Sequence, residues 1–189
     1  MNRYPVMRTR ILALLAIGAA ACRPQQTTAP SPVPTSSAPA CPALTQPANG
    51  WPVIADTSGF TITLPPRFEE RSKGTGARHF DMAPDYEESI IIGTIVGDLG
   101  LTAYRRPFQA GLMLDYSECT EMIGGDPVSI QAWRTPNGVF RNGQRADRYD
   151  VFAIRQVRPG VFLYFTGGTY RAPTQALMLA SIRSWRRLR

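Results

Sequence analysis

The chain has 189 residues, with 21 lysine and arginine residues against 14 aspartate and glutamate residues, which gives a formal net charge of +7. This mild excess comes almost entirely from arginine, since Lys73 is the single lysine, and it favours solubility more than any one acidic partner. The chain has one histidine and three cysteines, and all four would have to meet at one place to fill a zinc site, so a zinc-dependent function is a poor interpretation.

Residues 1–21 are typical of an export signal. Arg3, Arg8 and Arg10 precede an uncharged apolar run from Ile11 to Ala21. That run is too short for a transmembrane helix, which needs about 20 apolar residues. A basic head, a short apolar segment and small residues at the cleavage point predict a secretory signal peptide.

Ala19-Ala20-Ala21-Cys22 resembles the lipobox of bacterial lipoproteins, with Ala19 where leucine is usual. The resemblance implies that Cys22 is lipidated, becomes the first residue of the mature chain and anchors it to a membrane of the cell envelope. The alternative is an ordinary signal peptide cut after Ala21, which leaves Cys22 as a thiol. Outside the cytoplasm no nucleic-acid partner is expected, and the candidate acidic partners are anionic lipid, phosphorylated polysaccharide or an acidic envelope protein.

Residues 22–50 predict a disordered tether behind the lipidated cysteine. Arg23 is the only charge between residues 23 and 49, and the rest is mostly Pro, Thr, Ser, Ala and Gln. Large apolar side chains are nearly absent, so little offsets the entropy of ordering this segment. Seven prolines favour extended conformations: Pro24, Pro30, Pro32, Pro34, Pro39, Pro42 and Pro47.

Residues 51–189 have the usual size of one domain, and we expect a single one. Its first half begins with two predicted strands, over 60–64 and 77–82. A continuous β-branched run over 89–96 predicts a buried central strand. Between Thr102 and Tyr116, apolar residues four apart predict a helix that begins near Pro107.

The second half predicts two hairpins and a final helix. Strands over 119–123 and 128–133 flank a Gly-Gly-Asp-Pro turn, and strands over 148–157 and 161–165 flank a tight turn at Pro159-Gly160. Residues 173–185 have helical spacing, with a proline suited to the first turn. The fold class is therefore α+β, an antiparallel β-sheet covered by helices.

The segment Phe60–Phe68, the Ile123-Gly124-Gly125 turn, the hairpin around Pro159-Gly160 and the ending Ala180–Trp185 together resemble the PsbP-like/DcrB-like group. This resemblance implies a small α/β/α sandwich of a kind often exported on a lipid anchor. Group members act as accessory or binding proteins rather than enzymes. No site motif is shared, so no functional residue carries over.

Cys41 and Cys119 are the two cysteines that remain once Cys22 is lipidated. In an oxidising compartment such a pair is expected to form a disulfide, which would join the end of the tether to the domain. Two unpaired thiols or an intermolecular bridge are the alternatives.

Chemistry-bearing residues are sparse, and we predict neither a catalytic residue nor a metal site or cofactor. His79 and Asp81 lie two apart on a predicted strand, so the carboxylate could orient the imidazole as a base. Asp81, Asp85, Glu87 and Glu88 supply oxygen atoms for calcium, but their spacing matches no calcium loop, and a solvated loop is the better interpretation.

Two segments mix arginine with aromatic residues, a composition that suits anionic surfaces and protein interfaces. One is Tyr104–Phe108, and the other is the C-terminal group of Arg183, Arg186, Arg187 and Arg189 around Trp185. The alternative is structural, because arginines complement a helix C-terminus and Trp185 is expected to pack in the core.

The sequence thus predicts a lipid-anchored cell-envelope protein with a non-catalytic binding or scaffolding domain. The alternatives are an envelope hydrolase that uses His79 and the nearby carboxylates, and a purely structural spacer.

Overall fold

The structure is a computed structural model, and it describes residues 41, 45–56, 59–74, 76–84, 87–97, 104–139 and 143–188. These residues belong to one compact unit, Ser37–Arg189. The expected signal peptide, Cys22 and most of the expected tether lie outside the described residues. In the described part of the chain, no helix is long and apolar enough to cross a membrane.

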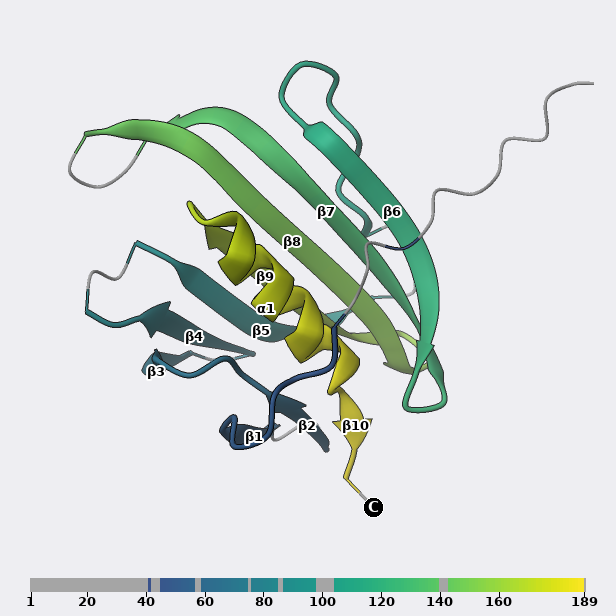
Figure 1. The fold of residues 1–189 in the computed structure, drawn as a ribbon. Coiled ribbons are helices and arrows are strands. Elements are labelled where there is room, and N and C mark those ends of the chain that lie inside the picture. Colours follow the sequence, from purple (N-terminus) through teal and green to yellow (C-terminus); the bar gives the residue numbers. More distant parts are fainter. Residues whose placement is uncertain are drawn as a thin grey trace, which may run out of the picture. The chain divides into compact units, whose positions relative to one another are not determined.

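Seven strands form one antiparallel sheet in the order β3-β4-β5-β9-β8-β7-β6 (Figure 1). Strands β6, β7, β8 and β9 follow one another as a meander, and β9 returns to pair with β5. The strands are β3 (Phe68–Gly74), β4 (Ala77–Met82), β5 (Ser89–Val96), β6 (Leu114–Ile123), β7 (Asp126–Val139), β8 (Arg145–Arg158) and β9 (Val161–Thr169).

A second, three-stranded sheet brings the two ends of the domain together. Strand β2 (Phe60–Thr63) pairs with β1 (Val53–Asp56) on one side and with β10 (Arg186–Arg187) on the other, all antiparallel. Beyond β10, the backbone N–H of Leu188 donates to the carbonyl of Gly59 at 2.8 Å. The last described residues therefore lie against the first hairpin.

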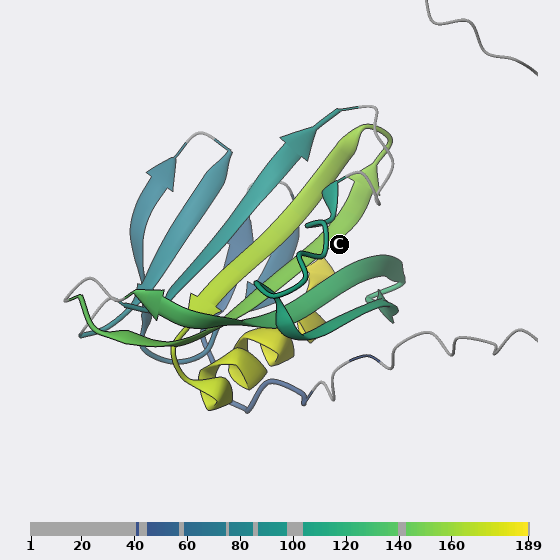
Figure 2. The same cartoon turned by 90° about the horizontal axis from the view of Figure 1, so that it is seen from above.

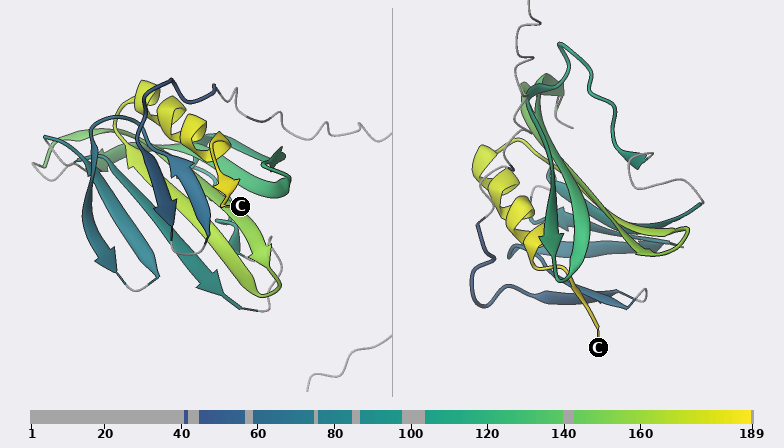
Figure 3. Two further views of the ribbon diagram at one scale, coloured as in Figure 1. Left: turned by 90° about the horizontal axis from the view of Figure 1, so that it is seen from below. Right: turned by 90° about the vertical axis from the view of Figure 1, so that its right-hand side faces the viewer.

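One α-helix, α1 (Ala172–Arg183), lies across the large sheet, and Figures 2 and 3 show it on one face only. We call this face the inner face. Met178, Leu179 and Ile182 of α1 are buried against it, together with apolar side chains of β2. Trp185 is also fully buried, as the sequence predicts. Burial of this apolar surface is the main source of stability, and it holds α1 and the small sheet on the large one.

The opposite face, which we call the outer face, has a smaller apolar cluster built on Trp133, Phe152, Ile154 and Phe162. The segment 104–113 covers this cluster; Tyr104 packs on Phe162 with ring centroids 4.8 Å apart. The right-hand view of Figure 3 shows the segment on the side of the sheet away from α1.

The predicted helix over 102–116 is wrong. The described residues 104–113 contain no α-helix, and strand β6 begins at Leu114. Gln131 of β7 explains the difference, because its side chain accepts from the backbone N–H of Arg106 and donates to the carbonyl of Arg106, both at 2.9 Å. The carbonyl of Arg106, which would accept the first hydrogen bond of a helix beginning at Pro107, is thus bound to the sheet. The described residues therefore hold one α-helix, not the two that the sequence predicts.

The predicted strands over 60–64, 77–82 and 89–96, both hairpins and the final helix are confirmed, with all four hairpin strands, β6 to β9, longer than predicted. Strands β1, β3 and β10 are not predicted by the sequence. Strand β3 contains Glu69, Glu70 and Arg71, and such polar residues give no alternation of apolar side chains. It forms because β4 offers a partner at the sheet edge, where one neighbour is enough.

Candidate functional site

Strand β4 brings together the histidine and the aspartate that the sequence singles out. His79 and Asp81 flank the buried Phe80 on the strand, so their side chains project from the outer face. Nε2 of His79 lies 2.9 Å from Oδ1 of Asp81. Ser72 stands opposite His79 in the register of β3 and β4. Among the described residues, however, no hydrogen bond joins a hydroxyl group to the imidazole. The pair is an oriented histidine without an attached nucleophile.

The acidic residues around this pair do not form the solvated loop that the sequence predicts. Asp81 and Glu88 are only 6% and 5% exposed, and Asp85 lies outside the described residues. The carboxylate of Asp81 lies 3.8 Å from Arg71, and that of Glu88 lies 3.4 Å from Arg171. Within the described part of the chain, no group of three or more histidine, cysteine or acidic residues is placed to hold a metal ion.

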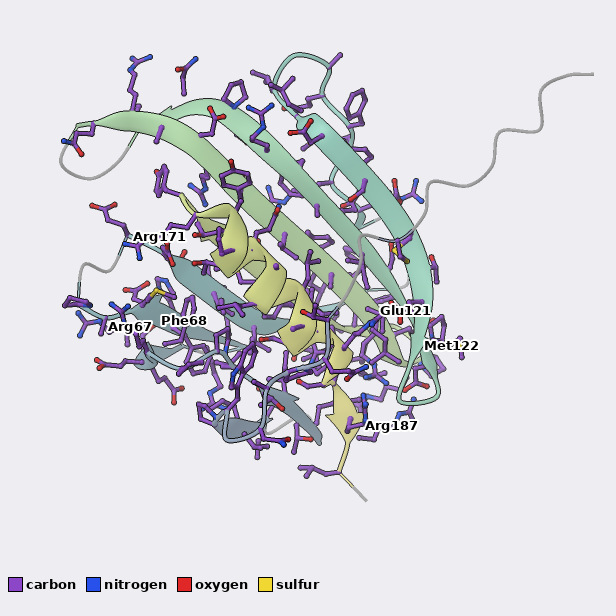
Figure 4. The ribbon with its side chains drawn as sticks, in the orientation of Figure 1. Arg67, Phe68, Glu121, Met122, Arg171 and Arg187 are labelled. Carbon is purple, nitrogen blue, oxygen red and sulfur yellow. A yellow bond between two sulfur atoms is a disulfide. The ribbon has the colours of Figure 1, made fainter. Side chains whose placement is uncertain are left out.

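The C-terminal arginines make contacts within the domain. Arg183 pairs with Glu121 at 2.9 Å, and Arg187 donates two hydrogen bonds of 2.9 Å to Asp126. Arg186 donates to the carbonyls of Arg183 and Trp185, at the end of the helix where carbonyl groups need donors. Figure 4 shows Arg187 at the same end of the molecule as Glu121 and Met122. Arg189 lies outside the described residues.

Asp126 has a second arginine partner that the sequence does not reveal. Arg155 of β8 is fully buried and binds the same carboxylate, while its guanidinium lies 4.9 Å from the ring centre of Phe60 and 5.9 Å from that of Trp185. Burial alone would raise the pKa of Asp126, but the hydrogen bonds from Arg155 and Arg187 bring this pKa below its ordinary value. Burial lowers the pKa of Arg155, and two of its nitrogen atoms, Nε and Nη1, have no hydrogen-bond partner.

A hollow of about 510 Å³, which we call the arginine cleft, opens between the small sheet and the ends of β5, β8 and β9. Arg158 and Arg187 stand on its wall and also line a neighbouring hollow of about 360 Å³. The cleft is lined by Gly59, Phe60, Thr94, Val96, Val157, Arg158, Val161, Arg187 and Leu188.

A second hollow, of about 410 Å³, lies between the segment 104–113 and the outer face; we call it the outer-face hollow. Asp150 stands in it, accepting from the Arg148 guanidinium at 2.9 Å and from the Thr135 hydroxyl at 3.1 Å. Arg106 also lines it and has no carboxylate partner among the described residues. The remaining lining residues are Pro107, Gln109, Leu112, Met113, Trp133 and Thr166.

The predicted binding segment Tyr104–Phe108 forms one side of this hollow and is partly committed to the fold. Arg105 pairs with Glu118 at 2.6 Å, and Glu118 accepts from the hydroxyl of Tyr116 at 2.6 Å. Burial raises the pKa of Tyr116, and its hydrogen bond to Glu118 adds to the rise. Phe108 packs on Tyr116 with ring centroids 5.0 Å apart, yet remains 56% exposed. Arg106 is thus the exposed arginine of the segment without a carboxylate partner among the described residues, and the exposed ring of Phe108 lies two residues away.

The predicted disulfide is confirmed, since Cys41 and Cys119 are bonded, with their Cα atoms 5.1 Å apart. Cys119 belongs to β6, the edge strand of the large sheet. Residue 41 is therefore fixed to this edge of the sheet.

Sequence reasoning missed the Arg155–Asp126 pair and both hollows. One signal was available. Val151, Ala153 and Arg155 are two residues apart on an apolar strand, so their side chains project from the same face, and that face is the one toward the core. The hollows have no such signal, because each is lined by strands far apart in the sequence.

No family model and no curated protein matches the chain. Among solved structures, the yeast Saccharomyces cerevisiae Ran-binding protein Mog1p is similar to 73% of this chain and 95% of its own, with 9% identity and a TM-score of 0.47. A protein from Bacteroides thetaiotaomicron is similar to 71% of this chain, with 12% identity and a TM-score of 0.46. The match spans about half, 47%, of that Bacteroides protein.

Proposed function

We propose that the protein is a lipid-anchored cell-envelope protein whose domain binds a partner protein and carries out no chemistry of its own. The apolar signal ending at Cys22 supports the anchor, and the proline-rich segment behind it supports a tether that keeps the domain near the membrane. The resemblance to the PsbP-like group supports an accessory role, although here the irregular segment 104–113, and not a helix, covers the outer face.

The observation that carries the binding role is the outer-face hollow. Its charged groups are held in place, because Asp150 is fixed by Arg148 and Thr135, while Arg106 keeps a guanidinium without a carboxylate partner among the described residues. At its rim Leu112 is 57% exposed. Oriented polar groups beside exposed apolar side chains are the composition of a protein-binding site.

The test begins with crosslinking in the native envelope to identify the partner, followed by binding of the purified partner to the purified protein. Leu112→Arg is expected to weaken this binding at least tenfold, because it places a large charge at the rim of the hollow. Val53→Arg is the matched control, since Val53 is 65% exposed on β1 of the small sheet. Equal affinity of the two variants would contradict this location of the site.

The anchor has its own test. Cys22→Ser is expected to move the protein from the membrane fraction to the soluble fraction, and mass spectrometry of the wild type is expected to show acyl chains on Cys22. An unmodified Cys22, together with unchanged fractionation of the variant, would show that the anchor is absent.

A hydrolase is the second candidate, favoured by the contact between His79 and Asp81. The substitution His79→Ala distinguishes the two functions, because a binding domain would still bind its partner and a hydrolase would lose turnover. We expect wild type and variant to be equally inactive on broad hydrolase substrates and to bind the partner equally. Turnover that disappears in the variant would favour the hydrolase.

A further inference from the structure

The arginine cleft combines exposed aliphatic side chains with positive charge. Val96, at the end of β5, is 79% exposed, and Leu188, after β10, is 50% exposed. Both line the cleft beside Phe60. Two exposed aliphatic residues at one opening form a small apolar patch that an apolar partner can cover.

The charge at this end is not balanced. Arg158, at the tip of the β8–β9 hairpin, is exposed and has no carboxylate partner among the described residues. Arg187 is 52% exposed, and its partner Asp126 also neutralises the buried Arg155, so one carboxylate serves two guanidinium groups. Arg186 adds a third exposed guanidinium, bound only to carbonyl groups.

The same end continues across the neighbouring hollow to the β6–β7 hairpin. Arg158 and Arg187 line that hollow together with Pro127, and Pro127 pairs with Met122, which is 66% exposed. Figure 4 shows Met122 and Arg187 at this end. Exposed apolar side chains therefore flank the arginines on both sides.

We propose that this end of the domain docks on an anionic phospholipid membrane, with a lipid phosphate held between Arg158 and Arg187. The side chains of Val96, Leu188 and Met122 enter the interfacial region of the bilayer. Arginine beside exposed aliphatic residues has the chemistry of such an interface, where a positive charge binds lipid phosphate and apolar side chains leave water. This inference rests on the proposed function, which brings the domain to a membrane.

Docking at this end determines where the outer-face hollow lies relative to the membrane. Arg158 ends β8, whereas Arg148, in the outer-face hollow, lies ten residues earlier on the same strand. At about 3.3 Å per residue, the two arginines are roughly 30 Å apart. Docking through Arg158 therefore holds the outer-face hollow away from the lipid, where an envelope protein can reach it.

The test measures vesicle binding without the anchor. The chain from residue 22 onward, with Cys22→Ser, is sedimented with vesicles of phosphatidylcholine containing phosphatidylglycerol, and with vesicles of phosphatidylcholine alone. Arg158→Glu is compared with Arg145→Glu, because Arg145 begins the same strand, is also exposed and has no carboxylate partner among the described residues. Both substitutions change the net charge equally.

We expect binding to the anionic vesicles only. Arg158→Glu should weaken it roughly 25-fold, since each basic residue near an anionic bilayer contributes about fivefold, and Arg145→Glu should change it less than threefold. Val96→Ser, with the 57% exposed Val139→Ser as its control, tests the apolar contact in the same way. The melting temperature of each variant shows that it is folded.

Three outcomes would overturn the inference: no binding by the parent chain, equal loss with Arg158→Glu and Arg145→Glu, or a purified envelope protein whose binding needs Arg158 while vesicle binding does not. The last outcome would assign this end to an acidic protein. Acylation of Cys22 is measured separately, so failure of docking with an acylated Cys22 leaves the proposed function standing.

Discussion

Removal of the Asp126 carboxylate is the most direct test of how this domain is held together. Arg155 is fully buried and has no other carboxylate partner among the described residues, so Asp126→Ala leaves a buried charge uncompensated. Breaking a buried ion pair from one side costs about 3 to 5 kcal/mol. For a domain of this size the melting temperature is expected to fall by about 10 °C or more.

The assay is denaturant and thermal unfolding of three variants with one control. Arg155→Met removes the charge and keeps apolar volume between Phe60 and Trp185, while Asp126 keeps Arg187 as its partner. The double variant Asp126→Ala with Arg155→Met is therefore expected to be more stable than Asp126→Ala alone.

Asp147→Ala is the control, because Asp147 pairs with Arg134 at the surface, where an ion pair contributes little. A loss below about 1 kcal/mol for Asp126→Ala, or no recovery in the double variant, would refute the argument that Arg155 depends on this carboxylate.

Three further predictions concern the fold. Replacing both Cys41 and Cys119 by serine should lower the free energy of unfolding by up to about 4 to 5 kcal/mol, the upper value for closing so long a loop, and no change in the denaturation midpoint would contradict it. Because the pKa of Asp126 is lowered in the folded state, its contribution to stability is present above the unfolded pKa of about 4 and is lost as the pH falls below that value. The free energy of unfolding should therefore depend less on pH in Asp126→Ala than in the wild type. Gly93→Ala should cost about 1 to 3 kcal/mol, because a Cβ there would lie 2.6 Å from the ring of Tyr164 on β9; wild-type stability of this variant would show that the ring can move aside.

The helix predicted over 102–116 shows where local pattern failed. Phe108, Leu112 and Tyr116 have helical spacing, but Tyr116 belongs to strand β6 and contacts Gln131 of β7. The spacing is that of a helix, but the side chain of Gln131 binds the backbone of Arg106 and holds this segment against the sheet. A contact between residues 25 apart in sequence is invisible to a periodicity that spans a few residues.

Candidate site residues divide in the same way. The contact between His79 and Asp81 follows from alternation along one strand and was predictable. The partners of Arg183 and Arg187, namely Glu121 and Asp126, come from the β6–β7 hairpin and were not predictable. For this reason a C-terminal group that the sequence presents as a free basic surface is largely bound to the domain.

By itself the sequence determined most strands, the last helix and the two cysteines that pair, and it predicts an export signal and a proline-rich tether before the domain. Each of these follows from composition or from spacing within a short segment, where turn residues and apolar alternation act locally. Tertiary structure alone decided that Asp126 serves both Arg155 and Arg187, that Arg158 remains exposed, and that two hollows open at opposite ends of β8. Those features depend on the register of strands far apart in the chain, and register is set by how the whole core is buried.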